Sequence, residues 1–586
     1  MGWELVTSLR SLGRLALAIL PQQIRLGLSV PGSETCRCFP GDTCWPTSQE
    51  WASFNQSVKD NLVATVPLGA PCHDSSFGPY NATECSRLRE QWTFPELHYV
   101  SSSSAMAPYF ANASCDPFTE RDARCEHGTY VRYAVDVHSA EEVSATLEFA
   151  KSKNIRIVIR NTGHDWNGKS TGAGALAIWT HNLKDIKVFD YQDEHYSGKA
   201  MRMGAGVQAF EAYAAAHEHD VVVLGGECPT VGLAGGYTTG GGHSALSSKY
   251  GLSADQVLAW EVVDGSGRHL IATRDNDHRD LYWAISGGGG GTYAVVLSMT
   301  VKVHPDTMTS GAKLRFSSNG IRKDIYWQAI EAYHVALPDI VDEGIVSVAQ
   351  FDHDSFAINP MTGPGVSSER MKTLLQTYLK SLDDLGVNYT LEVKQFPNYF
   401  EEFQAMFSHI GTASFQYGSR IISRNSMLEN LTAITTAFRQ AADDSCSFFS
   451  VASNVSETVA GDVYNAVNPV WRTALLHAVI QAPWDSLASW STMVASAEKM
   501  TSKHVAAFEA VTPGSGVYIN EADPNDPRWK ESYYGMNYER LLQVKDNYDP
   551  DGIFYALTAV GADRWEEKVD GRLCKTAKGF DGRWDL

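Results

Sequence analysis

The sequence predicts an α+β protein with two lobes, and three observations lead to that prediction. The chain has 586 residues, which is more than one hydrophobic core usually covers. Residues 130–159 read as a strand, a helix and a second strand, which together form a βαβ unit. After about residue 306, glycine-rich loops give way to long helical stretches, so we expect a second lobe of different character to begin there.

The βαβ unit is the clearest local prediction. Residues 130–135 are strand-like, and Ser139 followed by Glu141 and Glu142 has the chemistry of a helix start. Val143 and Leu147 then recur at helical spacing, and residues 155–159 form a β-branched strand. Further strands are expected at 176–179 and 260–263, and residues 264–267 have the composition of a hairpin turn.

The second lobe is predicted from longer periodic stretches. Helices are expected near 323–336, 368–385, 427–442 and 485–500, and a strand at 345–349. We therefore divide the chain into a possible signal or leader (1–30), a cysteine-rich extension (31–125), a first domain (126–306), a second α+β lobe (307–510) and a loop-rich, aromatic C-terminal segment (511–586).

Charge and hydropathy exclude several classes of partner. With 48 basic and 68 acidic residues the formal net charge is -20, which argues against nucleic acid or an anionic membrane as the main partner. No stretch approaches the roughly 18–20 apolar residues that span a bilayer. Arg10 and Arg14 precede a short apolar run at 15–20, which resembles a weak signal peptide; an unstructured leader or a misplaced start is the alternative.

The cysteines indicate an oxidising compartment. Seven of the ten cysteines come before residue 126, in a loop-like segment, which is the pattern of disulfides in a secreted protein. Zinc is the competing interpretation, but Cys36 and Cys38 are too close for ordinary zinc spacing. Six glycosylation sequons agree with the secretory pathway: Asn55, Asn81, Asn112, Asn388, Asn430 and Asn454.

Two glycine-containing segments carry the chemistry. The first is Arg160-Asn161-Thr162-Gly163-His164-Asp165, directly after a predicted strand. A glycine turn there brings successive N–H groups together in a nest that suits a pyrophosphate, although the histidine could be merely a satisfied polar residue. The segment matches neither the dinucleotide-binding nor the P-loop pattern.

The second segment, residues 225–244, has eight glycines in twenty positions and continues through 250–255. Such a run could be a flexible linker. The embedded Val231, Leu233 and Tyr237 favour an ordered ligand wall instead, and Cys228 stands in that wall far from the other cysteines.

Together these segments resemble the FAD-binding domain of the vanillyl-alcohol-oxidase superfamily, also called PCMH-type. Residues 533–545, with Tyr548-Asp549-Pro550 and Phe554, resemble the closing element of berberine-bridge-type enzymes. The cysteine-rich start is similar to fungal secreted members, including isoamyl alcohol oxidase-like proteins. The resemblance implies a two-lobed FAD-binding fold with an α+β substrate lobe and a C-terminal segment that returns to the FAD domain.

The resemblance also implies that FAD is attached twice. His164 stands where the family bonds the flavin 8α-methyl group, and Cys228 stands where it bonds C6. That assignment leaves nine other cysteines, so at least one must be free. No metal is expected. Further cofactor contacts are expected at Arg160, Asn161, Thr162, Gly163, Asp165, Val231, Gly232, Gly235, Gly236, Thr238, Gly241, Gly242, His243, Ser244, Asp255, Val263 and Asn537.

The implied reaction is hydride transfer from a substrate C–H to flavin N5, followed by reduction of O₂ to H₂O₂. Val231 occupies the family's oxygen-gate position. Candidate bases are Tyr518, Glu521 and Tyr538, each of which could instead be structural; Glu521 departs from the tyrosine common in relatives.

The expected partners are a small-molecule substrate, either an alcohol or a secondary-metabolite intermediate, and O₂. One alternative is a carbohydrate oxidase, in which Trp327, Trp471, Trp484 and Trp490 would be platforms rather than core residues. Others are a flavoprotein that templates a cyclisation with little or no net redox change, and a binding protein with a vestigial flavin. The substrate and oligomeric state are not readable from sequence.

Overall fold

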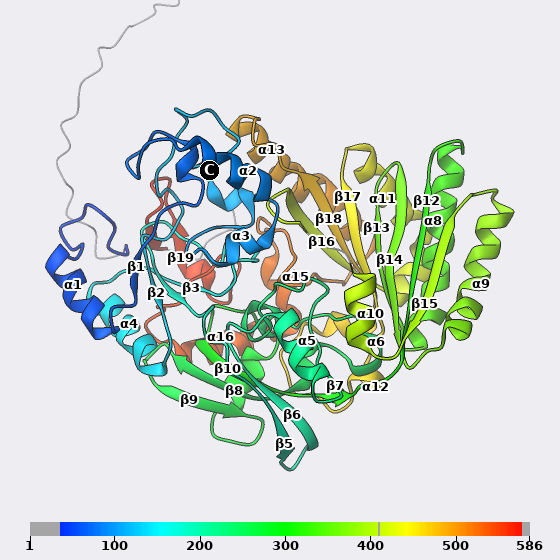
Figure 1. Ribbon diagram of the computed structural model, residues 1–586, viewed down its shortest axis with the longest axis horizontal. Coiled ribbons are helices and arrows are strands. Elements are labelled where there is room, and N and C mark those ends of the chain that lie inside the picture. The colour runs from blue at the N-terminus through cyan, green and yellow to red at the C-terminus, as the bar shows by residue number, and fades with distance from the viewer. Residues whose placement is uncertain (1–35, 408–410, 577–586) are drawn as a thin grey trace, which may run out of the picture.

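The computed structural model describes residues 36–407 and 411–576 (Figure 1). It contains helices and strands throughout, as the α+β prediction requires. The possible leader, residues 1–30, lies outside the described residues. In the described residues the strands form two larger sheets in the first domain, one large sheet in the second lobe, which lies on the right in Figure 1, and two small two-stranded sheets, β11-β7 and β19-β20.

The predicted βαβ unit builds the first sheet, whose strand order is β1-β2-β4-β3. Strand β2 runs parallel to β4, β4 runs parallel to β3, and α4 connects β2 to β3. Ser139 caps α4 by accepting a hydrogen bond from the Glu142 N–H, as the sequence indicated. The bounds are β1 (Leu62–Ala64), β2 (Tyr133–Asp136), α4 (Ala140–Ser152), β3 (Ile157–Arg160) and β4 (Leu176–Trp179).

The second sheet is antiparallel, in the order β5-β6-β10-β8-β9. The predicted hairpin turn joins β8 to β9, where the Asp264 carboxylate accepts hydrogen bonds from the N–H groups of Ser266 and Arg268. The strands of this sheet are β5 (Ile186–Gln192), β6 (Ser197–Gly204), β8 (Val257–Asp264), β9 (His269–Thr273) and β10 (Ala294–Lys302). The helices between them are α5 (Ala209–His217), α6 (Ser247–Tyr250) and α7 (Arg279–Ile285). The short strand β7 (Val221–Val222) pairs separately with β11 (His304–Pro305).

The second lobe is a seven-stranded antiparallel sheet in the order β15-β12-β14-β13-β17-β18-β16. Its strands are β12 (Thr309–Ser317), β13 (Val346–Phe351), β14 (Ser355–Pro364), β15 (Thr390–Phe396), β16 (Phe415–Ser423), β17 (Ser447–Ala452) and β18 (Ala474–Pro483). Its helices are α8 (Lys323–Asp342), α9 (Ser368–Asp384), α10 (Tyr399–Met406), α11 (Arg424–Asp443), α12 (Glu457–Ala460), α13 (Trp490–Lys499) and α14 (Ala506–Val511). Apolar residues of α8, α9 and α11 pack on one sheet face, so the opposite face is available to the first domain.

The cysteine-rich extension contains α1 (Ser48–Ser57), α2 (Ala82–Gln91) and α3 (Pro95–Tyr99). Four disulfides tie it down: Cys36–Cys574, Cys38–Cys44, Cys72–Cys85 and Cys115–Cys125. Among the described residues the free cysteines are Cys228 and Cys446, so the expectation of at least one free thiol besides Cys228 is confirmed.

The C-terminal segment returns to the first domain, as the resemblance implied. Ile157 in β3 forms a parallel bridge with Phe554, and the Lys545 ammonium in α16 donates to the carbonyl oxygens of Thr292 and Phe554. The first disulfide joins Cys36 to β20. The bounds are α15 (Trp529–Tyr534), α16 (Tyr538–Tyr548), β19 (Trp565–Glu567) and β20 (Leu573–Lys575).

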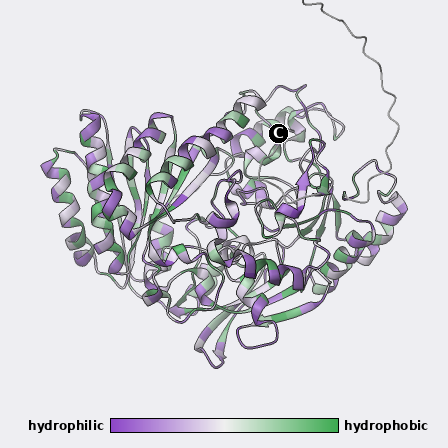
Figure 2. Cartoon of the chain, turned by 180° about the vertical axis from the view of Figure 1, so that it is seen from behind, coloured by the Kyte–Doolittle hydropathy of each residue, from purple (hydrophilic) through white to green (hydrophobic). Residues whose placement is uncertain are grey.

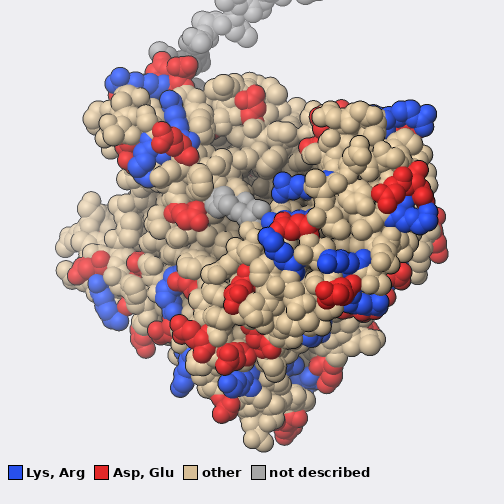
Figure 3. All heavy atoms as spheres, turned by 45° about the vertical axis from the view of Figure 1, so that its right-hand side comes forward, with Lys and Arg blue, Asp and Glu red and all other residues tan. Residues whose placement is uncertain are grey.

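Figures 2 and 3 show how hydropathy and charge are distributed over the chain. Apolar and polar residues alternate along the strands and helices in Figure 2, and on the face shown in Figure 3 basic and acidic side chains are interspersed without a basic strip. No helix in residues 36–407 and 411–576 is long and apolar enough to cross a membrane.

Candidate active site

A cavity of about 280 Å³ lies where the two sheets of the first domain meet the second lobe. Both predicted glycine-containing segments line it. Of the predicted site residues, the lining includes Asn161, Thr162, Gly163, His164, Asp165, Cys228, Val231, Gly232, Gly235, Gly236, His243, Tyr518 and Glu521.

The His164 loop turns sharply after β3. Gly163 has φ +84°, and a Cβ there would lie 2.6 Å from the Arg160 guanidinium. Arg160 is fully buried and donates hydrogen bonds to the carbonyl oxygens of His98, Ser101 and Ser104. Arg160 does not line the cavity; it fastens the cysteine-rich extension to the loop that carries His164.

The two residues predicted to attach the cofactor face each other across one hydroxyl group. His164 Nε2 lies 2.8 Å from Thr230 Oγ1, and Cys228 Sγ lies 3.5 Å from the same oxygen. Burial lowers the pKa of His164 to about 3, so its imidazole is neutral at neutral pH. Burial raises the pKa of the Cys228 thiol, an effect that hydrogen bonds from Thr230 partly offset.

A buried charge cluster closes the cavity beyond these residues. Glu521 Oε1 lies 3.3 Å from His243 Nε2, and Glu521 Oε2 lies 2.9 Å from His477 Nε2. On the other side of the His243 ring, Nδ1 lies 3.4 Å from the Glu227 carboxylate. The carboxylate of Glu521 is therefore held between two imidazoles, in contact with the cavity.

The charges in this cluster are unequal. Burial works against the charged forms, but Glu227 and Glu521 outweigh it and raise the pKa of His243 to about 10. His243 and His477 likewise overcome the burial of Glu521 and lower its pKa to about 2. Burial lowers the pKa of His477, so that ring is neutral at neutral pH. The cluster thus holds an ionised Glu521, a protonated His243 and a neutral His477.

These charges make a testable prediction for stability against pH. Because the pKa of Glu521 is lowered, its contribution to stability is complete above pH ~4.5 and is lost as pH falls toward 2. Because the pKa of His243 is raised, its contribution is complete below pH ~6.5 and is lost as pH rises toward 10. We expect the difference in Tm between wild type and Glu521→Gln to be largest between pH ~4.5 and 6.5; a pH-independent difference would contradict the charge assignment.

The other two candidate bases are less suited to accept a proton in the cavity. Burial raises the pKa of Tyr518 well above 10, and its phenol oxygen accepts a 2.6 Å hydrogen bond from Asn520 Nδ2, so it stays protonated. Tyr538 does not line the cavity, because α16 directs its hydroxyl to Asp563 (3.2 Å) and to the Gly561 N–H (3.3 Å). The geometry therefore favours Glu521 over both tyrosines.

Several predicted cofactor residues support the site from outside the lining. Asp255 forms a buried ion pair with Arg472 (2.7 Å), and Asn537 Nδ2 donates to the carbonyl oxygens of Ala466 and Val467, both at 3.2 Å. The hydroxyl of Thr238 is hydrogen-bonded to the hydroxyl of Ser253, and Val263 is buried in an apolar core of the first domain. The lining also omits Gly241, Gly242 and Ser244. These residues shape the wall rather than contact the cavity.

Sequence reasoning missed a third glycine segment, 287–291, of which Gly289, Gly290 and Gly291 line the cavity. A Cβ on Gly290 would lie 3.1 Å from the Gly236 Cα, so this run packs backbone to backbone against the second motif. Gly289 and Gly291 have φ of +100° and +70°, which favours glycine. Five consecutive glycines between a helix and a strand were the available signal.

The second lobe contributes one sheet face, which sequence reasoning also missed. Gln350 pairs with Phe449 across β13 and β17, and Tyr417 pairs with Gln481 across β16 and β18. All four side chains line the cavity. Trp166, two residues after His164, stacks on Tyr417 with ring centroids 3.7 Å apart and planes 6° apart. The second lobe thus lines the cavity that is predicted to hold the flavin with aromatic side chains and two amide groups.

The four tryptophans considered as carbohydrate platforms are absent from the described lining of this cavity. Trp327 is buried in the core of the second lobe, and Trp471 is buried in a smaller apolar cluster beside that core. Trp484 and Trp490 contact each other instead, with ring centroids 6.2 Å apart.

The cavity suits a polar, planar cofactor. Buried lining atoms without a hydrogen-bond partner among the described residues include Asn161 Oδ1 and Glu227 Oε1. Asn161 also packs against Gly232 and Gly235, where a Cβ would lie 2.9 and 2.7 Å from its side chain. Unsatisfied polar atoms and glycine-lined walls are what a nucleotide cofactor requires.

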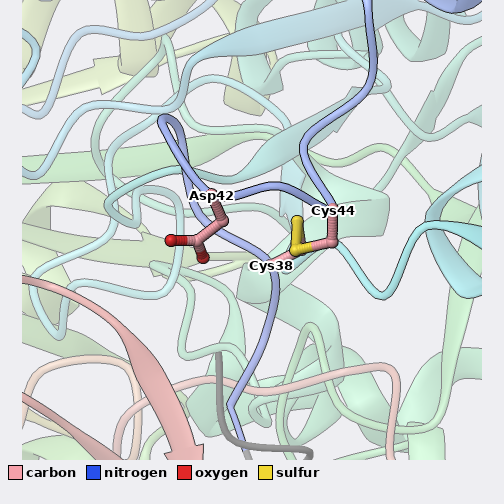
Figure 4. Close-up of side chains that lie close together, drawn as sticks. All are labelled: Cys38, Asp42 and Cys44. Carbon is pink, nitrogen blue, oxygen red and sulfur yellow. A yellow bond between two sulfur atoms is a disulfide. The ribbon is translucent and has the colours of Figure 1, made fainter. Parts of the chain in front are cut away.

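Three groupings among the described residues have the spacing of metal ligands, and one of them, Glu194, His195 and Asp275, consists of exposed residues. Cys38, Asp42 and Cys44 lie close together, but Figure 4 shows the two sulfurs joined in a disulfide, and Asp42 pairs with Arg572. Zinc binding by these cysteines is therefore incompatible with the structure. His243, His477 and Glu521 also offer ligand atoms within 4.8 Å of one another, but the carboxylate is already hydrogen-bonded to both rings.

Comparisons with known proteins identify relatives that match most of the chain. Residues 131–273 match the family model described as FAD binding domain, and residues 517–561 match berberine and berberine like. The chain is 45% identical over 569 residues to FAD-linked oxidoreductase patO of Penicillium expansum, covering 96% of this chain and 98% of the relative. It is 40% identical over 572 residues to the bifunctional decalin synthase calF of Penicillium decumbens, covering 94% and 97%.

Among solved structures, the VAO-type flavoprotein MtVAO615 of Myceliophthora thermophila C1 superposes with a TM-score of 0.89 at 41% identity, covering 92% of this chain and all of that one. Fold, site and relatives define an FAD-dependent oxidoreductase. The chain belongs to the berberine-bridge-enzyme-like family of FAD-linked oxidoreductases.

Proposed function

We propose that the protein is an oxidase of a small substrate with an apolar, aromatic-compatible body and a reacting alcohol. The observation that carries the proposal is Glu521, an ionised carboxylate in the same cavity as His164 and Cys228. His164 and Cys228 would hold FAD, which would supply the hydride acceptor and the route of the electrons to O₂ to give H₂O₂. The net change is alcohol plus O₂ to carbonyl plus H₂O₂.

The residues of this chain handle the substrate proton. The substrate hydroxyl donates to Glu521 as its carbon loses hydride, so that no oxocarbenium charge is left behind. A carboxylate whose pKa is about 2 is a weak terminal acceptor. His477 is neutral, so its Nε2–H donates a hydrogen bond to the ionised Glu521 at 2.9 Å, and His243 keeps its own charge between Glu227 and Glu521. Glu521 therefore holds the substrate proton transiently, until that proton is used in forming H₂O₂.

The sheet face positions the substrate. Trp166, Tyr417 and Phe449 offer aromatic surface, and the amides of Gln350 and Gln481 can bind substrate oxygens. Val231, by resemblance the oxygen-gate residue, lines the cavity beside Cys228; its small side chain is compatible with O₂ entry.

Peroxide release tests this function. Purified protein mixed with aromatic and secondary-metabolite alcohols is expected to form one H₂O₂ per carbonyl product. Substrate conversion without peroxide under air would overturn the oxidase assignment.

A cyclisation is the second candidate, and the name of the relative calF favours it. A templating enzyme would give cyclised product with less than one H₂O₂ per turnover, so the same peroxide-to-product ratio separates the two. A carbohydrate oxidase is less favoured, because the candidate tryptophan platforms do not line the cavity.

Secretion remains part of the proposal, and it makes a prediction about glycans. The disulfides fit an oxidising compartment. Asn388 is exposed between α9 and β15, whereas Asn454 Nδ2 is bonded to Asp342 (2.8 Å). We expect endoglycosidase to increase gel mobility, and Asn388→Gln to reduce that shift while the matched Asn454→Gln leaves it unchanged. Equal gel mobility of wild type before and after endoglycosidase treatment would contradict secretion with glycosylation.

A further inference from the structure

Thr230 stands between the two side chains that are proposed to hold the cofactor. Its Oγ1 lies 2.8 Å from His164 Nε2 and 3.5 Å from Cys228 Sγ. The residue is 4% exposed, so water does not compete freely for this hydroxyl. A hydroxyl has one hydrogen and two lone pairs, and here it can serve both side chains at once.

The position of this hydroxyl is set by the fold. The Thr230 carbonyl oxygen accepts a 2.7 Å hydrogen bond from Gln208 Nε2, and Gln208 is itself 2% exposed. The next residue is held as well, because the Ala209 N–H donates to the Val231 carbonyl at 3.0 Å. The start of α5 thus anchors the segment that carries both Cys228 and Thr230.

The protonation states of His164 and Cys228 indicate what the Thr230 hydroxyl does. His164 is neutral, and because Nε2 faces Thr230, Nδ1 is the ring nitrogen left to face the cavity. Attachment through Nδ1 requires loss of the proton on Nε2. Cys228 reacts only as its thiolate, which burial disfavours and hydrogen bonds from the hydroxyl and N–H of Thr230 favour.

We propose that Thr230 is the positioning residue for the double attachment of FAD: its hydroxyl orients His164 and conducts the protons that His164 and Cys228 lose. The inference rests on the proposed double attachment. Each bond forms with loss of one hydrogen from a cofactor carbon and one from the side chain. The two electrons pass to the isoalloxazine and then to O₂, which takes up two protons as H₂O₂.

The test measures attachment rather than turnover. Wild type, Thr230→Val and Thr230→Ser are produced with excess FAD, and peptides containing residues 164 and 228 are analysed by mass spectrometry over time. Wild type and the serine variant should carry both bonds. The valine variant, which is isosteric but has no hydroxyl, should form the Cys228 bond about tenfold more slowly or worse, because the thiolate loses a charge-assisted hydrogen bond.

The outcomes separate the two ideas. If wild type carries both bonds and Thr230→Val forms both bonds equally fast and completely, the role of Thr230 is overturned while the double attachment stands. Wild type without covalent flavin overturns the double attachment and the inference together. If the valine variant does not fold, Thr230→Ala removes the hydroxyl without added bulk, and the comparison with Thr230→Ser still decides.

Discussion

Replacing Glu521 with glutamine is expected to slow flavin reduction by substrate about 10²–10⁴-fold, the usual cost of losing a general base. Glutamine keeps the shape of the side chain but cannot accept the substrate proton. The loss should appear in the reductive half-reaction measured by stopped flow, with FAD still covalently bound and reoxidation by O₂ near normal. A reduction rate within about threefold of wild type would remove Glu521 from the mechanism.

The matched control is Tyr538→Phe. Both residues come from the C-terminal segment, but the Tyr538 hydroxyl contacts Asp563 and the Gly561 N–H rather than the cavity. We expect this variant to reduce at close to the wild-type rate, with at most a loss of stability. A large rate loss in Tyr538→Phe and none in Glu521→Gln would invert the assignment made from the geometry.

A purely structural Glu521 predicts a different pattern. Removing its charge leaves the imidazolium of His243 paired only with Glu227, at 3.4 Å, which lowers the pKa of His243 and destabilises the cluster. The Tm falls in either case, but a purely structural Glu521 leaves the protein that folds reducing at the normal rate. Measuring the Tm and the reduction rate on the same preparation separates the two roles.

Local chemistry was readable from the sequence where it is contiguous. The βαβ unit at 130–159 and the glycine-containing segments carry their signals within a few residues, because turns, caps and strand periodicity are local. The structure accordingly brings His164 and Cys228 together, each on its predicted segment. The signal of the glycine segment 287–291, which the sequence analysis did not use, is contiguous in the same way.

The remaining site residues depend on long-range packing. His477 contacts Glu521 only because β18 lies between β17 and β16, an order that no local pattern specifies. The same sheet order brings Gln350, Tyr417 and Gln481 to one cavity face. Tyr538 illustrates the reverse: the helix was recognisable, but the direction of its hydroxyl follows from how α16 packs.

Removing both attachment points is expected to abolish covalent flavin completely. His164 and Cys228 line one cavity and converge on the Thr230 hydroxyl from segments 64 residues apart, while the other free thiol of the described residues, Cys446, is buried in the core of the second lobe. The single variants His164→Ala and Cys228→Ala should each keep a yellow chromophore after denaturation, because the other bond remains. The double variant should release all of its flavin.

The matched control for this experiment is Cys446→Ala, which removes a thiol without touching the cavity and should retain both bonds. The measurement is the absorbance of protein precipitated with acid, together with mass spectrometry of the flavin-bearing peptides. Either single variant losing all covalent flavin would mean that one bond must form before the other. Freely extractable FAD in wild type would refute covalent attachment altogether, whereas retention in the double variant would place the bond on a different residue.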